Sequence, residues 1–309
     1  MIISASRRTD IPAFYSDWFY KRIQEGFVLI RNPMNLHQVS RISLKREEVD
    51  CIVFWTKNPE SMLPKLSLIR DYQYYFQFTL NPYDVEFEAG VPRKTLVIDT
   101  FKRLSDIIGP RRVIWRYDPI ILNTAIDVGY HEKFFEVLAK KVHKYTSKCI
   151  ISFVDNYKKT EKNFKAHGIK ELDDMKKKEI AQKLYYIART YNLKVETCAE
   201  DIDLIEMGIE HAKCIDPVLI ESLMGVGINF KKDHNQRKTC GCIASVDIGA
   251  YNTCTHGCVY CYANCSKESV ERNIVDYDVD SPLLCSKLPK EPSPQAMRWS
   301  LEIVPMGIW

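Results

Sequence analysis

The chain has 309 residues, 46% of them hydrophobic, which is enough to bury a substantial core. Its 44 basic and 40 acidic residues leave a formal charge of +4, a balance that tolerates an anionic substrate without demanding nucleic acid. We find no stretch that approaches the roughly eighteen continuous apolar residues of a membrane span, and no signal peptide at the N-terminus. We therefore expect a cytoplasmic protein, whose eleven cysteines are metal ligands or core residues and not disulfides.

Apolar, β-branched runs predict strands along the chain, separated by segments with helical periodicity. The expected strands are Ile2–Ser4, Phe27–Ile30, Cys51–Trp55, Tyr74–Phe78, Val113–Trp115, Cys149–Val154, Leu193–Val195 and Ile243–Ile248. The expected helices are the stripe Phe14, Trp18 and Ile23, residues 60–70, Val97–Ile108, Phe134–Val142, Ile180–Ile187 and Asp201–Met207. Such alternation is typical of parallel βα units in an open sheet or a barrel. We expect an α/β fold, a TIM-like (β/α) barrel, complete or partial.

One loop near the end of the chain has the most concentrated chemistry. It contains Cys254, Cys258 and Cys261, with three residues between the first two cysteines and two between the last two. Three thiolates around one metal centre leave a coordination position open for a second molecule, whereas a structural zinc site normally takes four protein ligands. Iron–sulfur clusters are held by cysteine runs of similar density. A zinc knuckle is the alternative interpretation.

This motif, including Tyr260 just before the third cysteine, resembles the signature of the radical S-adenosylmethionine (SAM) enzymes. Together with Arg7–Pro12, Phe54–Pro59 and Trp115–Pro119, the run from Cys240 to Asn264 resembles the DUF1848 family. The resemblance implies that the three cysteines hold a [4Fe-4S] cluster, that SAM binds its fourth iron, and that Tyr260 lies near the adenine. It implies an oxygen-sensitive enzyme that takes an electron from a donor such as flavodoxin or ferredoxin. That enzyme would cleave SAM reductively to methionine and a 5′-deoxyadenosyl radical, which abstracts a substrate hydrogen atom.

The order of the strands is unusual for this class, because the cluster loop of radical SAM proteins follows the first barrel strand and here follows the last. In a closed cylinder the last strand lies beside the first. We therefore expect a circularly permuted barrel, in which Ile243–Ile248 pairs on both edges and is a parallel neighbour of Ile2–Ser4. The predicted domains are the barrel with its cluster loop, residues 1–265, and an irregular arm packed on it, residues 266–309, with Pro282, Pro289, Pro292 and Pro294.

Polar residues follow several predicted strands, at the ends where βα barrels carry their chemistry. The expected cofactor-binding residues are Tyr260, Asn81, Arg116 and Glu196, and the expected substrate-binding residues are Arg7, Arg8, Asp10 and Lys57. The arginines are expected to hold an anion, because an unpaired guanidinium beside an apolar wall is costly. The anion would be the SAM carboxylate or an anionic substrate, either a small molecule or nucleic acid. Taken one by one, such polar residues are often only loop caps and turn formers.

A second set of cysteines comprises Cys198, Cys214, Cys240 and Cys242. Four thiolates suffice for a second, closed [4Fe-4S] cluster or a tetrahedral zinc site. The alternative is that the first two are core residues and the last two a reducible thiol pair. The competing hypothesis is a binding or regulatory protein without SAM chemistry. In such a protein the cysteines bind zinc or an iron–sulfur cluster, and the metal stabilises the fold.

Overall fold

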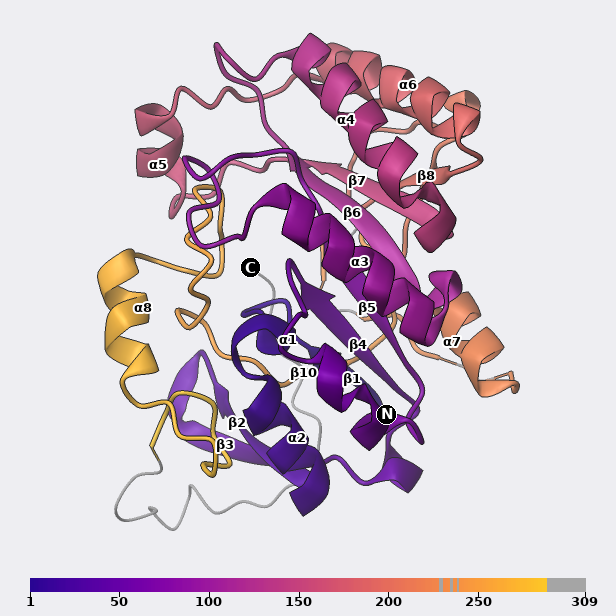
Figure 1. The fold of residues 1–309 in the computed structure, drawn as a ribbon. Coiled ribbons are helices and arrows are strands. Elements are labelled where there is room, and N and C mark those ends of the chain that lie inside the picture. Colours follow the sequence, from indigo (N-terminus) through magenta and orange to yellow (C-terminus); the bar gives the residue numbers. More distant parts are fainter. Residues whose placement is uncertain (228–229, 234–235, 238, 288–309) are drawn as a thin grey trace.

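The computed structural model describes residues 1–227, 230–233, 236–237 and 239–287 (Figure 1). Eight strands of this part form one parallel sheet. In spatial order they are β10 (Val246–Asp247), β1 (Ile2–Ala5), β4 (Cys51–Thr56), β5 (Tyr74–Thr79), β6 (Val113–Ile120), β7 (Lys148–Phe153), β8 (Lys194–Thr197) and β9 (Glu210–His211). The predicted α/β class with parallel βα units is therefore confirmed.

The α-helices begin and end at local sequence signals. The carboxylate of Asp127 accepts a hydrogen bond from the backbone N–H of Tyr130 at the start of α4, and a left-handed glycine, Gly26 with φ of 74°, ends α2. The α-helices are α1 (Ile11–Phe14), α2 (Ser16–Glu25), α3 (Lys94–Ile108), α4 (Val128–Val142), α5 (Glu161–Ala166), α6 (Asp174–Thr190), α7 (Pro217–Met224) and α8 (Lys267–Ile274). Short 3-10 helices are η1 (Arg46–Glu48), η2 (Leu63–Ile69), η3 (Pro110–Arg112), η4 (His143–Tyr145) and η5 (Ile205–Met207).

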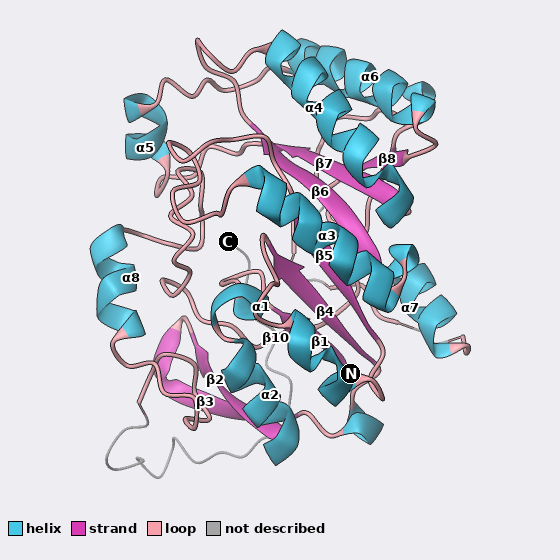
Figure 2. Cartoon of the chain, in the orientation of Figure 1, coloured by secondary structure: helices cyan, strands magenta, loops and turns pink. Residues whose placement is uncertain are grey.

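The two faces of the sheet are covered differently, because alternate strand residues point to opposite sides. The outer face carries Ile3, Ile52, Phe76, Trp115 and Ile151, which belong to one core with the apolar sides of α2, α3, α4 and α6. Figure 2 shows α3, α4 and α6 along this face. The inner face carries Ile2, Val53, Tyr75, Ile114 and Ile150, which pack with α7 and with two coil segments, residues 212–215 and 240–243. The inner face is therefore covered mainly by the segments that carry the second set of cysteines.

The predicted contact between the first and last strands is confirmed. Ile3 pairs with Val246 and Ser4 with Asp247, in parallel register. The last strand is shorter than expected, because the backbone N–H groups of Ile243 and Ala244 donate outside the sheet, to Ile215 and Lys231. The expectation that this strand pairs on both edges is thus wrong for the described residues, since loop backbone meets these donors.

Closure into a complete cylinder is not seen in the part of the chain that the structure describes. There, β9 and β10 form the two edges of the sheet, and no ladder joins them. The sheet is open at this seam, and the first and last strands meet at one of its edges. A partial barrel stays a prediction.

Three expected elements differ in kind from the prediction. One is the helix expected at Asp201–Met207, of which only the 3-10 helix η5 (Ile205–Met207) forms. Phe27–Ile30 does form a strand, within β2 (Phe27–Asn32), but it pairs with β3 (Asn35–Ser43) in a separate antiparallel hairpin. The connection between β2 and β3 is only two residues long, too short for the crossover that parallel strands require. The expected helix at residues 60–70 is the 3-10 helix η2.

The described part of the C-terminal arm contacts α2 and β2. The indole of Trp18 donates to the carbonyl of Ser281 at 2.8 Å, and the backbone N–H of Leu29 donates to that of Pro282 at 2.9 Å. Pro289, Pro292 and Pro294 lie outside the described residues. Among the described helices, none combines the length and the apolar character that crossing a bilayer requires.

Candidate functional site at the cysteine loop

Asp247, in β10, fastens the start of the cysteine loop to β1. Its carboxylate accepts hydrogen bonds from Ser4 Oγ at 2.8 Å, Ser6 Oγ at 2.6 Å, and the backbone N–H groups of Arg7 at 2.9 Å and Gly249 at 3.0 Å. Burial raises the pKa of this carboxyl, but the charge of Arg8 and these hydrogen bonds together hold it below its ordinary value. A Cβ on Gly249 would lie 2.1 Å from Ser6 Oγ, so the chain leaves the strand at a point that only glycine fits.

The thiols of Cys254, Cys258 and Cys261 are free and half-buried, and they interact electrostatically with one another. Burial raises the pKa of all three, that of Cys258 to about 12. Backbone N–H groups oppose the effect of burial at two of these thiols: that of His256 lowers the pKa of Cys254, and those of Ala263 and Asn264 lower the pKa of Cys261. A backbone that favours the thiolate form suits cysteines that bind a metal, because metal binding displaces the thiol proton.

Within the described residues, no three His, Cys, Asp or Glu side chains are placed so that they could hold a single metal ion. In a four-iron cluster each cysteine binds a different iron, so its ligands stand farther apart than those around one ion. The three loop cysteines therefore fit a cluster by the chemistry of their donors and by their spacing on one loop.

The loop that follows β5 holds the cysteine loop in place. Glu88 and Cys258 form an antiparallel bridge, and the backbone N–H of Gly90 donates to the carbonyl of His256 at 2.7 Å. A Cβ on Gly90 would lie 2.4 Å from the carbonyl oxygen of Thr255, which is backbone and cannot turn away. The two loops therefore touch at their main chains.

Next to this contact, the carboxylate of Glu88 lies at the centre of a buried hydrogen-bond network. It accepts hydrogen bonds from Lys57 at 2.8 Å, from Asn81 at 3.4 Å, and from Lys94 and the Tyr260 hydroxyl. Burial raises the pKa of this carboxyl, yet the two lysines outweigh burial and lower it to about 2. For Lys57, by contrast, burial lowers the pKa. The charges of Glu88 and of the nearby Cys258 outweigh burial and raise this pKa above its ordinary value. Three predicted site residues, Lys57, Asn81 and Tyr260, thus meet at a carboxylate that the sequence did not single out.

Asp10 links three chain segments at the end of β1. One carboxylate oxygen accepts from the backbone N–H of Ala13 at 3.0 Å and so caps α1. The other accepts from the backbone N–H of Lys57 at 2.7 Å and lies 2.7 Å from Nε2 of His256, in the cysteine loop. The sequence placed Asp10 among the substrate-binding residues, and in the structure it ties the loop to the sheet.

The three predicted anion-binding arginines find their partners inside the chain. Arg116 forms an ion pair with Asp118 and places Nη1 2.8 Å from Cys214 Sγ. Arg7 interacts with the thiols of Cys214 and Cys242, and Arg8 with Asp247, Gly249 and the ring of Tyr251. Glu196, an expected cofactor ligand, lies on the inner face, 2.8 Å from Lys148 and 3.0 Å from Lys194. Arg116 and Glu196 are therefore not gathered at the cysteine loop. Arg7 and Arg8 do reach it, because the Tyr262 hydroxyl donates to the carbonyl of Arg7 at 3.0 Å and Arg8 lies over the ring of Tyr251.

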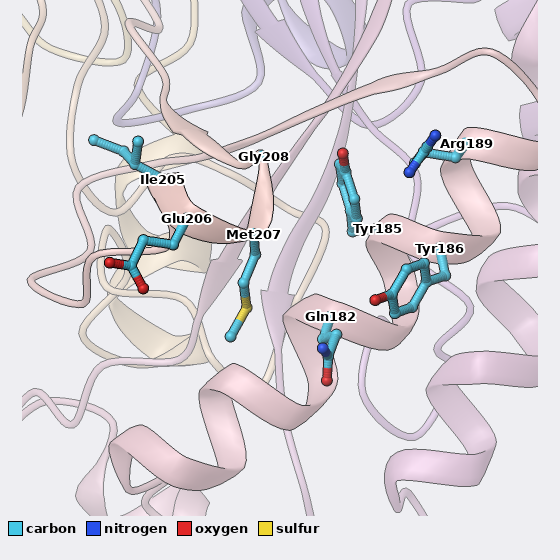
Figure 3. A pocket seen from close by; sticks show the side chains of 8 residues that line it. All are labelled: Gln182, Tyr185, Tyr186, Arg189, Ile205, Glu206, Met207 and Gly208. Carbon is cyan, nitrogen blue, oxygen red and sulfur yellow. The ribbon is translucent and has the colours of Figure 1, made fainter.

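Two hollows lie near the surface. One, of about 240 Å³, is lined by His256, Gly90 and residues of α1 and the loop after β4, and it is smaller than most ligand pockets. The other, of about 450 Å³, lies between α6 and η5 (Figure 3). Its wall includes Tyr185, Arg189 and Met207, and no cysteine lines it.

Glu88 and Lys94 are the site residues that sequence reasoning missed. Both lie outside the strands, and Glu88 shows neither a ligand spacing nor an apolar periodicity. The nearest available signal is the alternation of acidic residues at Asp84, Glu86 and Glu88, between β5 and α3.

A family model described as "Domain of unknown function (DUF1848)" matches residues 2–263. The chain belongs to the DUF1848 family. The match includes both cysteine sets of this DUF1848 protein and ends two residues after Cys261. Comparisons with curated proteins and with solved structures return no match. DUF1848 membership thus gives the chain a family but no activity, and function has to be argued from the site.

Proposed function

We propose that this protein is a radical SAM enzyme, in which Cys254, Cys258 and Cys261 hold a [4Fe-4S] cluster and SAM binds the fourth iron. The observation that carries the proposal is the meeting of three free, half-buried thiols on one loop, close enough to interact electrostatically with one another. When bound, the cluster supplies the electron for reductive cleavage of SAM, and the resulting 5′-deoxyadenosyl radical abstracts a hydrogen atom from the substrate.

The fold supports the same proposal. From β1 to β9 the parallel strands lie in sequential order, with long helices packed on the outer face. Sequential order with helices outside is the arrangement of a (β/α) barrel, whereas a doubly wound sheet reverses its strand order and carries helices on both faces. We therefore propose a partial, circularly permuted barrel over residues 1–265, which brings the cysteine loop to the ends of β1, β4 and β5.

In this proposal the buried charges position the loop. Lys57 and Tyr260, held by Glu88, fix the middle of the loop, and Asp10 fixes it through His256. The Tyr260 hydroxyl is directed into this network and so holds the loop. The adenine contact that the resemblance implied stays a prediction. An electron donor such as flavodoxin or ferredoxin would reduce the cluster. Because Arg116 has an acceptor within the chain, it no longer argues for an anionic substrate.

The test is anaerobic incubation of the purified chain with SAM and dithionite, followed by mass spectrometric detection of 5′-deoxyadenosine. We expect 5′-deoxyadenosine from the intact chain and a complete loss of it after Cys254→Ala, Cys258→Ala or Cys261→Ala. The matched control is Cys51→Ala, which removes a buried strand thiol from the inner face. It should leave SAM cleavage unchanged.

The competing zinc protein predicts a different result. A colourless chain that holds zinc at this loop and forms no 5′-deoxyadenosine would contradict the proposal. So would any one of the three alanine variants that still cleaves SAM, because that cysteine would then not be a ligand.

A further inference from the structure

Four cysteines outside the loop lie together at the inner face of the sheet. They come from three chain segments: Cys198 follows β8, Cys214 follows β9, and Cys240 and Cys242 precede β10. The sulfurs of Cys198 and Cys214 are 3.0 Å apart, and the thiol of Cys242 interacts with those of Cys214 and Cys240. The four thiols thus form one continuous chain of contacts, although the segments are far apart in sequence.

Two guanidinium groups face these thiols. Nη1 of Arg116 lies 2.8 Å from Cys214 Sγ, and the same side chain interacts electrostatically with Cys198. Arg7 interacts electrostatically with Cys242 and Cys214, and its Nη2 is buried without a hydrogen-bond partner among the described residues. A buried donor without an acceptor is rare in folded proteins, so Nη2 indicates that an acceptor belongs at this place. Neutral thiols are weak acceptors, whereas metal-bound thiolates are negatively charged.

The backbone around the thiols is held firmly. Tyr75 and Gln77, on the inner face of β5, donate to the carbonyl of Cys214 at 2.6 Å and 2.8 Å. The backbone N–H of Ile215 donates to Cys242 Sγ at 3.4 Å. A Cβ on Gly241 would lie 3.0 Å from Cγ of Lys213, so the Cys-Gly-Cys turn runs close against the residue before Cys214. These contacts make a built site, and not a chance meeting of core cysteines.

We propose that Cys198, Cys214, Cys240 and Cys242 form a second metal centre, a closed four-thiolate site for Zn²⁺ or for an iron–sulfur cluster. Four thiolates around either centre leave a net negative charge, which the guanidinium groups of Arg7 and Arg116 offset. Within the described residues, no three of these thiols are placed so that they could hold one metal ion. Binding of the metal therefore requires rotation of their side chains. A disulfide would leave Nη2 of Arg7 without an anionic acceptor. The inference is independent of the SAM chemistry proposed for the first site.

The test measures zinc, iron and acid-labile sulfide in the full-length chain purified without oxygen. One variant carries Cys254→Ala, Cys258→Ala and Cys261→Ala, and a second carries Cys198→Ala and Cys240→Ala. We expect the first variant to retain about one zinc per chain, or about four irons with as much sulfide. The second should lose that metal and keep only what the loop cysteines bind. A control with Cys51→Ala and Cys149→Ala, two buried strand thiols, should match the unaltered chain.

A second measurement on the unaltered chain keeps the test valid if the variants fold poorly. Alkylation of the native protein, followed by mass spectrometry, should modify these four cysteines only after chelators have removed the metal. The proposal is overturned if the loop variant holds no zinc or iron, or if the four thiols are alkylated at the same rate with and without chelator. A disulfide among them in the anaerobically purified chain also overturns it. A loss of SAM cleavage alone would count against the first site and not against this one.

Discussion

The carboxylate of Asp10 lies 2.7 Å from Nε2 of His256, although 246 positions separate them in the chain. Asp10 ends the first turn out of β1, and His256 lies inside the cysteine loop, between Cys254 and Cys258. The same carboxylate oxygen also accepts the backbone N–H of Lys57. One buried side chain therefore joins the ends of β1 and β4 to the loop, and it fixes where the three loop thiols stand relative to the sheet.

Replacing Asp10 tests this link. In Asp10→Asn, an amide nitrogen replaces one of the two carboxylate oxygens. Where this nitrogen faces the backbone N–H of Lys57, it cannot accept a hydrogen bond, so the N–H is left unpaired. We expect the free energy of unfolding to fall by about 1–3 kcal/mol, the usual cost of leaving a buried polar group unpaired. Urea unfolding should show a lower midpoint with an unchanged m-value.

The control for this prediction is Asp17→Asn, which removes the charge from a surface ion pair with Lys65. It should change the stability by no more than about 0.5 kcal/mol. Equal losses in the free energy of unfolding would mean that Asp10 contributes no more to stability than a surface carboxylate does.

A second prediction concerns Glu88, which is 2% exposed and pairs with two lysines. Glu88→Gln leaves both ammonium groups without their anion, and we expect a loss of about 3–5 kcal/mol at neutral pH. Because the pKa of Glu88 is lowered to about 2, its contribution is complete above its unfolded pKa. That contribution disappears as the pH falls through the folded value. The difference in stability between the unaltered chain and Glu88→Gln should therefore shrink as the pH falls from about 5 to about 2.

Urea unfolding across this pH range provides the measurement. Glu60→Gln is the comparison, since Glu60 pairs with Arg103 at the surface and should cost little at any pH. A stability difference for Glu88→Gln that stays constant down to pH 2 would contradict the assigned ion pairs.

Gly90→Ala makes a third prediction. The new Cβ would meet the carbonyl oxygen of Thr255 at 2.4 Å and Cα of His256 at 2.9 Å, so the cysteine loop has to move. We expect a loss of about 1–3 kcal/mol, as for other overpacked sites, together with less iron retained by the loop cysteines. Gly129→Ala, near the start of α4, is the matched control, because its Cβ would make only an ordinary contact at 3.5 Å. Normal iron content in Gly90→Ala would show that the loop tolerates the displacement.

The cysteine loop could be predicted from the sequence because its information is local: three cysteines, a glycine and a preceding strand lie within about twenty residues. The neighbours β1 and β10 were predictable as well, since the loop and the first strand had to open onto the same end of the sheet. The network at Glu88 could not be predicted in this way. Its hydrogen bonds to Lys57 and Tyr260 span 31 and 172 positions in the chain. They exist only because the loops after β4, β5 and β10 meet at the carboxyl ends of these strands.

The open seam between β9 and β10 is a second feature that could not be predicted from the sequence. Apolar patterning marks Ile243–Ile248 as a strand, but it cannot say that Ile243 and Ala244 would donate to loop carbonyls in place of a neighbouring strand. Patterning reports which residues are buried, and here burial is supplied by the coil that covers the inner face.

The last prediction is that removal of residues 240–309 prevents folding. The deletion strips β10 from β1 and takes from Ser4 and Ser6 the carboxylate of Asp247 that accepts their hydroxyl groups. It also removes Val246 and Ile248 from the outer core, and Cys242 and Ile243 from the inner one. An unpaired β1 edge with both faces uncovered is an aggregation site, so we expect the fragment 1–239 to be insoluble. Solubility after lysis and far-UV circular dichroism during urea unfolding provide the measurement. A soluble fragment with a cooperative transition would show that the cysteine region is a separate domain, and that the sheet does not need its last strand.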